Sequence, residues 1–354
     1  MPYLYSYYTS FRFIYSLLKY NEEIPSSLIT KTHNYAGLQG EPTPVKIIIP
    51  KKQGKKVVIL YPGASPTAED HPKMVMLGRL LAQVGFTVYI PRIPPLKNLD
   101  ISEINVQWFA HFYQWILEIE KVNPHHIIMV GISYGGGIML KTLLNIKDRV
   151  PLPKTLLTYG TYSDAESTLK FLLTGEISIK ETTYQITPHE WGLTVLFHNY
   201  LKNMETEWDT SGLQRAIQLH IQDKREKCDR QVSTLPKFQK NIFYSIITGN
   251  PTTEVKELAQ AIIKNEQETL KRLSPKYWAK NFQKKVFILH GSNDSMVPFT
   301  ESIQLAEDLP NSELFISYLH EHSEFSTDGS FFFNFMEIIK LIQFYANFFN
   351  HYAN

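Results

Sequence analysis

The chain has 354 residues, of which 43% are hydrophobic and 20% charged, and its formal net charge is +2. These values are typical of a globular protein with a large core, and the near-neutral charge without a lysine or arginine block argues against nucleic-acid binding. A single cysteine, Cys228, excludes an internal disulfide and suits a reducing compartment.

The first 44 residues are expected to form an N-terminal extension. Residues 1–20 are rich in tyrosine and phenylalanine, but they lack the basic start, apolar core and cleavage site of a secretory signal. We expect an aromatic-rich helix that packs on the domain or forms a wall of a pocket, with peripheral lipid contact as the alternative. Residues 21–44 are polar and turn-rich, which predicts irregular structure. No apolar run reaches about 18 residues, so we expect a cytoplasmic protein without a membrane span.

From residue 45 to residue 160, short apolar strands alternate with helical segments. Strands are expected at 45–50, 56–61, 85–91, 125–130 and 154–160, the first two as a hairpin. Helices are expected at about 72–84, 101–122 and 134–146. This alternation predicts an α/β fold with a mostly parallel central sheet and helices on both faces.

Residues 161–283 interrupt the alternation. Their periodicity predicts helices near residue 169 and at about 191–201, 213–224 and 255–273, without strands between them. We therefore expect a helical insertion between two parts of one core.

The core resumes over residues 284–354. Strands are expected at 285–290 and 313–318, with a helix at about 300–308 between them. A last helix is expected near 331–349. The predicted domains are thus the extension, a core formed by 45–160 and 284–354, and the insertion.

The segment around Ser133 predicts the reaction centre. A short apolar strand runs into Gly-Ile-Ser-Tyr-Gly at 131–135 and then into a helix. Such a turn holds the serine in a strained backbone conformation, and a side chain at Gly131 or Gly135 would obstruct it. Ser133 would lie in a cleft at the carboxyl end of parallel strands, with the amide of Tyr134 at the start of the helix. This context predicts a nucleophile.

Two further segments with possible catalytic side chains follow the last two predicted strands. His290-Gly-Ser-Asn-Asp-Ser-Met-Val-Pro298 comes directly after one strand, and His320-Glu-His322 comes after the next. With the serine motif, they resemble the nucleophile, acid and histidine segments of the α/β-hydrolase family, in the same chain order. The resemblance runs from about residue 45 to the end, except for the insertion. It implies the α/β-hydrolase fold, with residues 161–283 as a helical cap, or lid, inserted after the sixth strand.

The triad that this resemblance implies is Ser133, His322 and Asp294. A serine hydroxyl needs an adjacent base, and a carboxylate on the far nitrogen of the imidazole fixes its tautomer and stabilises the imidazolium. Asp294 matches the acid position of the family segment, and Asp164, after the sixth strand, is the second choice. The family's strand-to-histidine spacing favours His322 over His320, which stays the alternative base.

Two backbone amides are expected to form an oxyanion hole. The turn Pro-Gly-Ala-Ser-Pro at 62–66 resembles the His-Gly segment of the family, with Tyr61-Pro62 in place of the histidine. Proline has no amide hydrogen, so Ala64 is the expected donor by position, together with Tyr134. We expect neither a metal nor an organic cofactor, because no histidine spacing predicts a metal site and the reaction requires no cofactor.

These features predict a serine hydrolase that cleaves a small-molecule carboxylic ester through an acyl-enzyme on Ser133. Thioester, amide and lipid substrates are the neighbouring possibilities. The alternatives are an acyltransferase that uses the same triad and a non-catalytic binding protein on the same fold. The sequence leaves the oligomeric state open.

Overall fold

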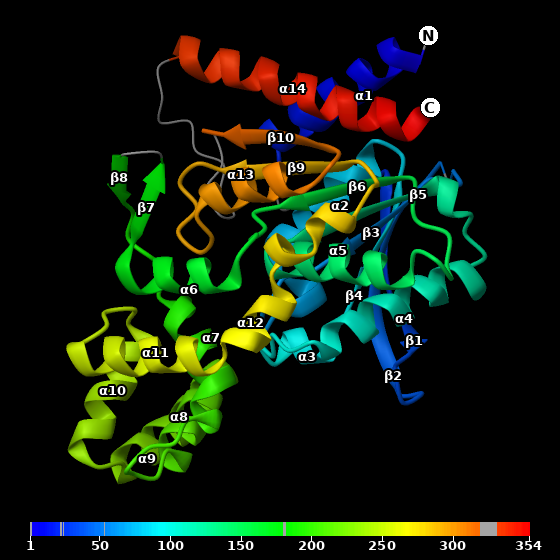
Figure 1. Ribbon diagram of the computed structural model, residues 1–354. Helices are drawn as coiled ribbons and strands as arrows, with labels where there is room; N and C mark the ends of the chain where they lie inside the picture. The colour runs from blue at the N-terminus through cyan, green and yellow to red at the C-terminus, as the bar shows by residue number, and fades with distance from the viewer. Residues whose placement is uncertain (1, 22, 24, 53, 180–181, 319–330) are drawn as a thin grey trace.

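A mostly parallel sheet forms the centre of the molecule, in a computed structural model that describes residues 2–21, 23, 25–52, 54–179, 182–318 and 331–354 (Figure 1). Its strands are β1 (Leu28–Ala36), β2 (Pro42–Pro50), β3 (Val57–Tyr61), β4 (Thr87–Pro91), β5 (Ile127–Ile132), β6 (Thr155–Tyr159), β9 (Val286–Gly291) and β10 (Ser312–Ser317). Among the described residues, the sheet order is β1-β2-β4-β3-β5-β6-β9-β10, and β2 runs in the direction opposite to that of the other strands. The predicted mostly parallel sheet is confirmed.

Helices cover both faces of this sheet. Those of the core are α1 (Pro2–Leu18), α2 (Pro72–Gln83), α3 (Pro94–Lys97), α4 (Ile104–Glu118), α5 (Tyr134–Ile146), α13 (Phe299–Asp308) and α14 (Phe331–Ala353). Buried side chains of α1, α2 and α14 cluster with Val130 and Leu157 on one face. Those of α4, α5 and α13 cluster with Met129 and Leu156 on the other. Neighbouring strand residues point to opposite faces, so each buried strand supplies both cores.

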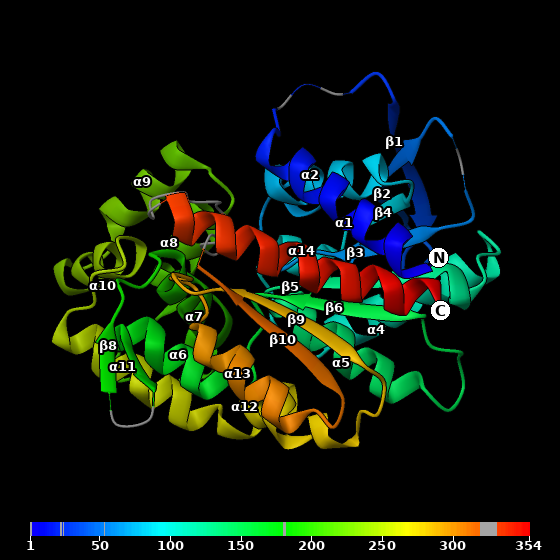
Figure 2. The ribbon, with the colours of Figure 1, turned by 90° about the horizontal axis from the view of Figure 1, so that it is seen from above.

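Helix α1 crosses α14 on one face of the sheet (Figure 2). The hydroxyl of Ser10 donates to the carbonyl of Ile342 at 2.6 Å, and the rings of Phe13 and Tyr345 lie 4.6 Å apart between centroids. The predicted helix packed on the domain is confirmed. Exposed aromatic side chains remain on α1, namely Tyr3, Tyr5, Tyr8, Phe11 and Tyr15. Lipid contact through these residues stays a prediction; in the described part of the chain, no helix has both the length and the hydropathy to cross a bilayer.

Two expectations for the N-terminal part were wrong. Residues 28–36, expected to be irregular, form the edge strand β1, which pairs antiparallel with β2. Most side chains of β1 are exposed, with Leu28 and Tyr35 buried, so the strand carries no regular apolar alternation. The expected hairpin of 45–50 with 56–61 does not form, because β4 lies between β2 and β3. Pairing across the β3–α2–β4 crossover replaces the local pairing.

Residues 161–283, called the insertion below, connect β6 to β9 and lie beside the sheet (Figure 1). Its helices are α6 (Ala165–Thr174), α7 (Trp191–Tyr200), α8 (Ser211–Ile221), α9 (Arg225–Thr234), α10 (Lys237–Ile247), α11 (Thr253–Asn265) and α12 (Gln267–Leu273). Their buried side chains, such as Leu196, Ile217 and Phe243, form a cluster separate from the two clusters that contain the strands of the central sheet. The expectation of an insertion without strands was wrong, because β7 (Glu176–Ile179) and β8 (Thr182–Gln185) pair antiparallel within it.

Candidate active site

Ser133 occupies the sharp turn between β5 and α5. Its backbone has φ 52° and ψ −129°, a region that costs a non-glycine residue about 1–3 kcal/mol. Neighbouring groups hold this conformation. The Ser133 amide donates to the carbonyl of Tyr159 at 2.7 Å, and its carbonyl accepts from the amide of Gly136 at 2.9 Å and from the hydroxyl of Thr161 at 3.1 Å. The strained turn that the motif predicts is therefore present.

Two glycines allow the close approach on which this turn depends. A Cβ at Gly131 would lie 2.6 Å from the Cα of Gly136, and a Cβ at Gly135 would lie 2.2 Å from the carbonyl oxygen of Pro62. Both contacts are with backbone, which cannot rotate away. The expected obstruction by side chains at these positions is confirmed.

The turn after β3 lies against the serine. A Cβ at Gly63 would be 3.1 Å from the Cβ of Ser133 and 3.7 Å from its Oγ. The amide of Ser65 already donates to a backbone carbonyl at 3.1 Å, whereas the amides of Gly63, Ala64 and Tyr134 have no acceptor within the described residues. Two of these, Ala64 and Tyr134, are the expected oxyanion donors. Their role stays a prediction.

Asp294 lies three residues after the end of β9, and its side chain is buried. Its Oδ1 accepts from the amides of Met296 and Val297, each at 2.8 Å, and its Oδ2 lies 3.2 Å from Nε2 of His290. The same Nε2 donates to the carbonyl of Val297 at 2.9 Å, and Nδ1 lies 2.6 Å from the hydroxyl of Ser302. His290 therefore holds the loop that carries the carboxylate. Sequence reasoning did not connect these two side chains, although they are four residues apart across a turn.

The histidine of the expected triad falls in a part of the chain that is not described. His320 and His322 both belong to residues 319–330, outside the described residues. The assignment of the base therefore stays a prediction. Within the described residues, no three histidine, cysteine, aspartate or glutamate side chains gather as metal ligands would.

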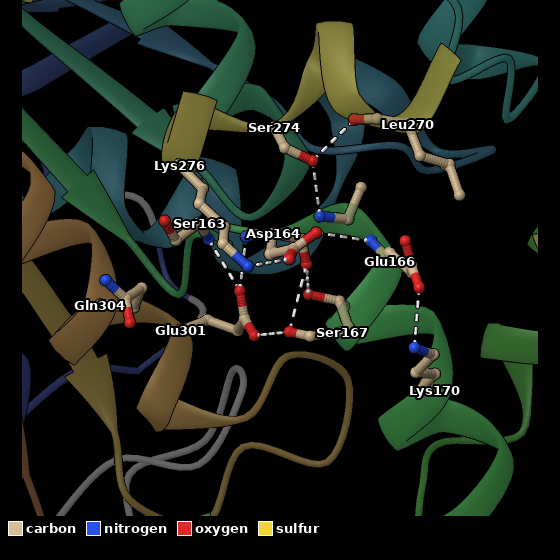
Figure 3. Close-up of polar contacts among 12 residues, drawn as sticks. Ser163, Asp164, Glu166, Ser167, Lys170, Leu270, Ser274, Lys276, Glu301 and Gln304 are labelled. Atoms are coloured by element: carbon tan, nitrogen blue, oxygen red, sulfur yellow. Dashed lines mark hydrogen bonds and ion pairs between the residues drawn. The ribbon is translucent and has the colours of Figure 1, made fainter. Parts of the chain in front are cut away.

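Asp164, the second-choice acid, begins helix α6. Its Oδ1 accepts from the amide of Glu166 at 3.0 Å, and its Oδ2 accepts from Nζ of Lys276 at 2.8 Å (Figure 3). The amide of Ala165 donates to the hydroxyl of Ser274 at 2.9 Å. Both carboxylate oxygens of Asp164 are thus used to cap the helix and to tie the start of the insertion to its end.

Glu301 anchors the same helix from the core. Its Oε2 accepts from the amides of Ser163 at 2.9 Å and Asp164 at 2.7 Å, and its Oε1 accepts from the hydroxyl of Ser167 (Figure 3). The side chain is buried, and this burial raises the pKa of Glu301, with a smaller contribution from the charge of Asp164. The three hydrogen bonds oppose this shift without cancelling it.

Substitutions of Glu301 should separate the contribution of its hydrogen bonds to stability from the contribution of its charge. Because the pKa of Glu301 is higher in the folded than in the unfolded chain, stability falls as the pH rises from about 4.5 through the folded-state value. Glu301→Gln keeps an acceptor for both amides and removes the ionisation. We expect it to match the parent near pH 4.5 and to exceed it in free energy of unfolding near pH 8.

Glu301→Ala is the matched comparison, since it leaves two buried amides without an acceptor and should cost about 3 kcal/mol. Urea unfolding at both pH values measures these differences. A Gln variant as unstable as the Ala variant near pH 8 would mean that the charge of Glu301 itself is needed.

Ser133 opens into a cavity of about 570 Å³, within the usual size of a small-molecule site. Ala64 and Tyr134 also line it, as do Met296 and Val297 of the loop that carries Asp294. Most of its remaining wall is apolar, and part of that wall comes from the insertion: Leu169, Leu172, Trp191, Val195, Tyr200 and Leu270. The candidate nucleophile, both expected oxyanion donors and the acid loop therefore face one largely apolar space.

The mostly parallel sheet, its helix-covered faces and the serine at the β5–α5 turn are those of the α/β-hydrolase fold. Solved structures agree. The chain is similar to the acylaminoacyl peptidase of Pyrococcus horikoshii, with a TM-score of 0.50 and 12% identity over 90% of this chain and 40% of that one. It thus spans less than half of the peptidase. At this level of identity, the similarity shows the fold alone.

Two other similar structures are a 2,6-dihydroxy-pseudo-oxynicotine hydrolase and a hormone-sensitive lipase from a metagenome library. The hydrolase has a TM-score of 0.49 and 15% identity, with 90% of this chain and 68% of the hydrolase covered. The lipase has a TM-score of 0.47 and 15% identity, with coverage of 92% and 87%. No protein-family model matches the chain. A search of curated proteins finds no significant match either.

Proposed function

We propose that this protein is a serine hydrolase that cleaves carboxylic esters with an apolar acyl or alcohol group. The observation that carries the proposal is the strained turn at Ser133, which faces an apolar cavity. The amide that follows it, at the start of α5, has no acceptor in the part of the chain that the structure describes. A strained non-glycine residue persists only where its surroundings impose it, and such residues cluster at active sites.

The proposed reaction proceeds by acyl transfer to water. Ser133 attacks the ester carbonyl while His322 takes its proton, and Asp294 orients the imidazole. The amides of Ala64 and Tyr134 bind the oxyanion of the tetrahedral intermediate. His322 then protonates the departing alcohol, and a water molecule activated by the same histidine hydrolyses the acyl-enzyme.

A fluorophosphonate reagent tests the activated serine directly. We expect one covalent adduct per chain, because an unactivated serine does not react with such reagents at neutral pH. Trypsin should release the labelled peptide 122–141, in which Ser133 is the sole serine, so mass spectrometry locates the adduct. A panel of p-nitrophenyl esters measures turnover in parallel. A folded protein that neither reacts nor turns over any ester would contradict the proposal and favour a binding protein.

Product analysis separates hydrolysis from acyl transfer. Both reactions use the same acyl-enzyme and differ in whether water or a second substrate attacks it. With an added alcohol or thiol, a hydrolase should still release mainly free acid, whereas an acyltransferase should release mainly the new ester or thioester.

A further inference from the structure

The cavity beside Ser133 extends beyond the carboxyl edge of the sheet. Its wall also contains Phe13 and Leu17 of α1, Leu80 of α2 and Tyr345 of α14. These helices cover one face of the sheet, and their side chains cluster with residues of that face. Part of the cavity therefore lies between the sheet and the helices α1, α2 and α14.

Strand residues indicate how far this part reaches. Val130 precedes Ser133 by three residues on β5, which corresponds to roughly 10 Å along a strand. Leu157 is paired with Val130 on the neighbouring strand β6. Both side chains line the cavity and belong to the cluster on the α1 face. The cavity thus runs along the sheet for roughly 10 Å, starting at the nucleophile.

We call this part the sheet arm and define it by Phe13, Leu17, Leu80, Val130, Leu157 and Tyr345. None of these side chains carries a charge, because five are hydrocarbon and a tyrosine hydroxyl is neutral at neutral pH. Burial raises the pKa of Tyr345 further. The arm therefore offers dispersion contacts and apolar surface, and no charged partner for a polar substituent. A group bound in the sheet arm must therefore be apolar and elongated.

We propose that the sheet arm binds the unbranched hydrocarbon chain of a long-chain acyl ester, whose carbonyl lies at Ser133. The opposite end of the cavity, lined by Leu172, Trp191 and Tyr200 of the insertion, then holds the alcohol part. The proposal rests on the proposed function, since it takes Ser133 as the nucleophile. Helix α1 becomes a wall of the substrate site and limits the length of chain that fits.

Binding to the inactive Ser133→Ala protein tests the arm without depending on turnover. Dansyl-labelled undecanoic acid serves as the fluorescent ligand, and unlabelled fatty acids from butanoate to hexadecanoate displace it below their micelle concentrations. We expect affinity to rise by about fourfold per methylene until the arm is full and then to level off. Affinity that does not depend on chain length would overturn the proposal.

A pair of neighbouring variants locates the chain. Leu17 lines the cavity and is half-buried, whereas Leu18 is 42% exposed and does not line it. Leu17→Trp should fill part of the arm, so that affinity stops rising at a shorter fatty acid. Leu18→Trp should leave the dependence of affinity on chain length unchanged. If Leu17→Trp fails to fold, Leu77→Trp on α2, also half-buried and lining, replaces it. If the folded variants at Leu17 and Leu77 show the same dependence of affinity on chain length as the parent, the hydrocarbon chain does not lie in the sheet arm.

The two proposals can fail separately. If the proposed function alone is wrong, the wild-type protein gives no fluorophosphonate adduct, yet fatty acids still bind with a length dependence. If only the proposed role of the sheet arm is wrong, Ser133 is labelled and short esters are hydrolysed, but fatty-acid affinity does not depend on chain length.

Discussion

Ser133→Ala should lower kcat for the best ester by about 10⁶-fold and abolish fluorophosphonate labelling. The hydroxyl is the only group that forms the acyl-enzyme, so no other side chain can replace its part in the reaction. Substrate affinity should change little, because the cavity wall and the amides of Ala64 and Tyr134 remain. Single-turnover and steady-state kinetics on one p-nitrophenyl ester measure the loss.

The variant should remain folded, since alanine meets the same backbone strain as serine at φ 52° and the bonds that hold the turn are to the backbone of residue 133. Ser178→Ala, at an exposed serine on β7, is the matched control and should keep wild-type kcat. A Ser133→Ala protein that unfolds like the parent and still turns over ester within tenfold of wild type would remove Ser133 from the mechanism.

The central part of the fold could be predicted from sequence because its strands are short, apolar and buried. All five residues of β3 and the first five of β5 are buried, and each strand is followed by a turn and a helix. Such apolar runs predict strands from their own sequence, without knowledge of the strands with which they pair. The glycine-framed turn at Ser133 was predictable for the same reason, since its geometry is local.

Elements that depend on distant pairing were not predictable. Strand β1 is an edge strand whose exposed Lys31, Thr32 and His33 resemble a loop in sequence. Strand β8 is exposed throughout, and the sequence between it and β7 contains neither glycine nor asparagine, the residues that most often indicate a hairpin. The pairing of β2 with β4 instead of β3 is set by the whole sheet and leaves no local signal.

At the candidate site, the sequence indicated individual residues better than their contacts. Asp164 was a plausible acid from its position, but its ion pair is with Lys276, 112 positions away. Its cap of α6, by contrast, is a local bond to the amide of Glu166. The burial of Glu301 under α6 also depends on a contact between distant parts of the chain. Side-chain partners of this kind follow from the packing of the insertion against the core.

Asp294→Asn should lower kcat by about 10⁴-fold while leaving the protein folded. The amide oxygen of asparagine can still accept from the amides of Met296 and Val297, so the loop should keep its turn. Its nitrogen, however, would occupy the place of Oδ2, 3.2 Å from the N–H of His290. Two donors would then face each other, and the side chain could no longer stabilise an imidazolium on the catalytic histidine.

Asp164→Asn is the matched substitution at the second candidate acid. It should keep kcat within a few-fold of wild type, because asparagine caps a helix as well as aspartate does. It should lower stability by about 1 kcal/mol, because it removes a negative charge from the N-terminus of α6 and breaks a partly exposed ion pair with Lys276. Steady-state kinetics and urea unfolding on both variants separate the two roles. The opposite pattern, with kcat lost at Asp164 and kept at Asp294, would move the triad acid to the end of β6 and leave Asp294 to shape the loop after β9, where its bonds to Met296 and Val297 already act.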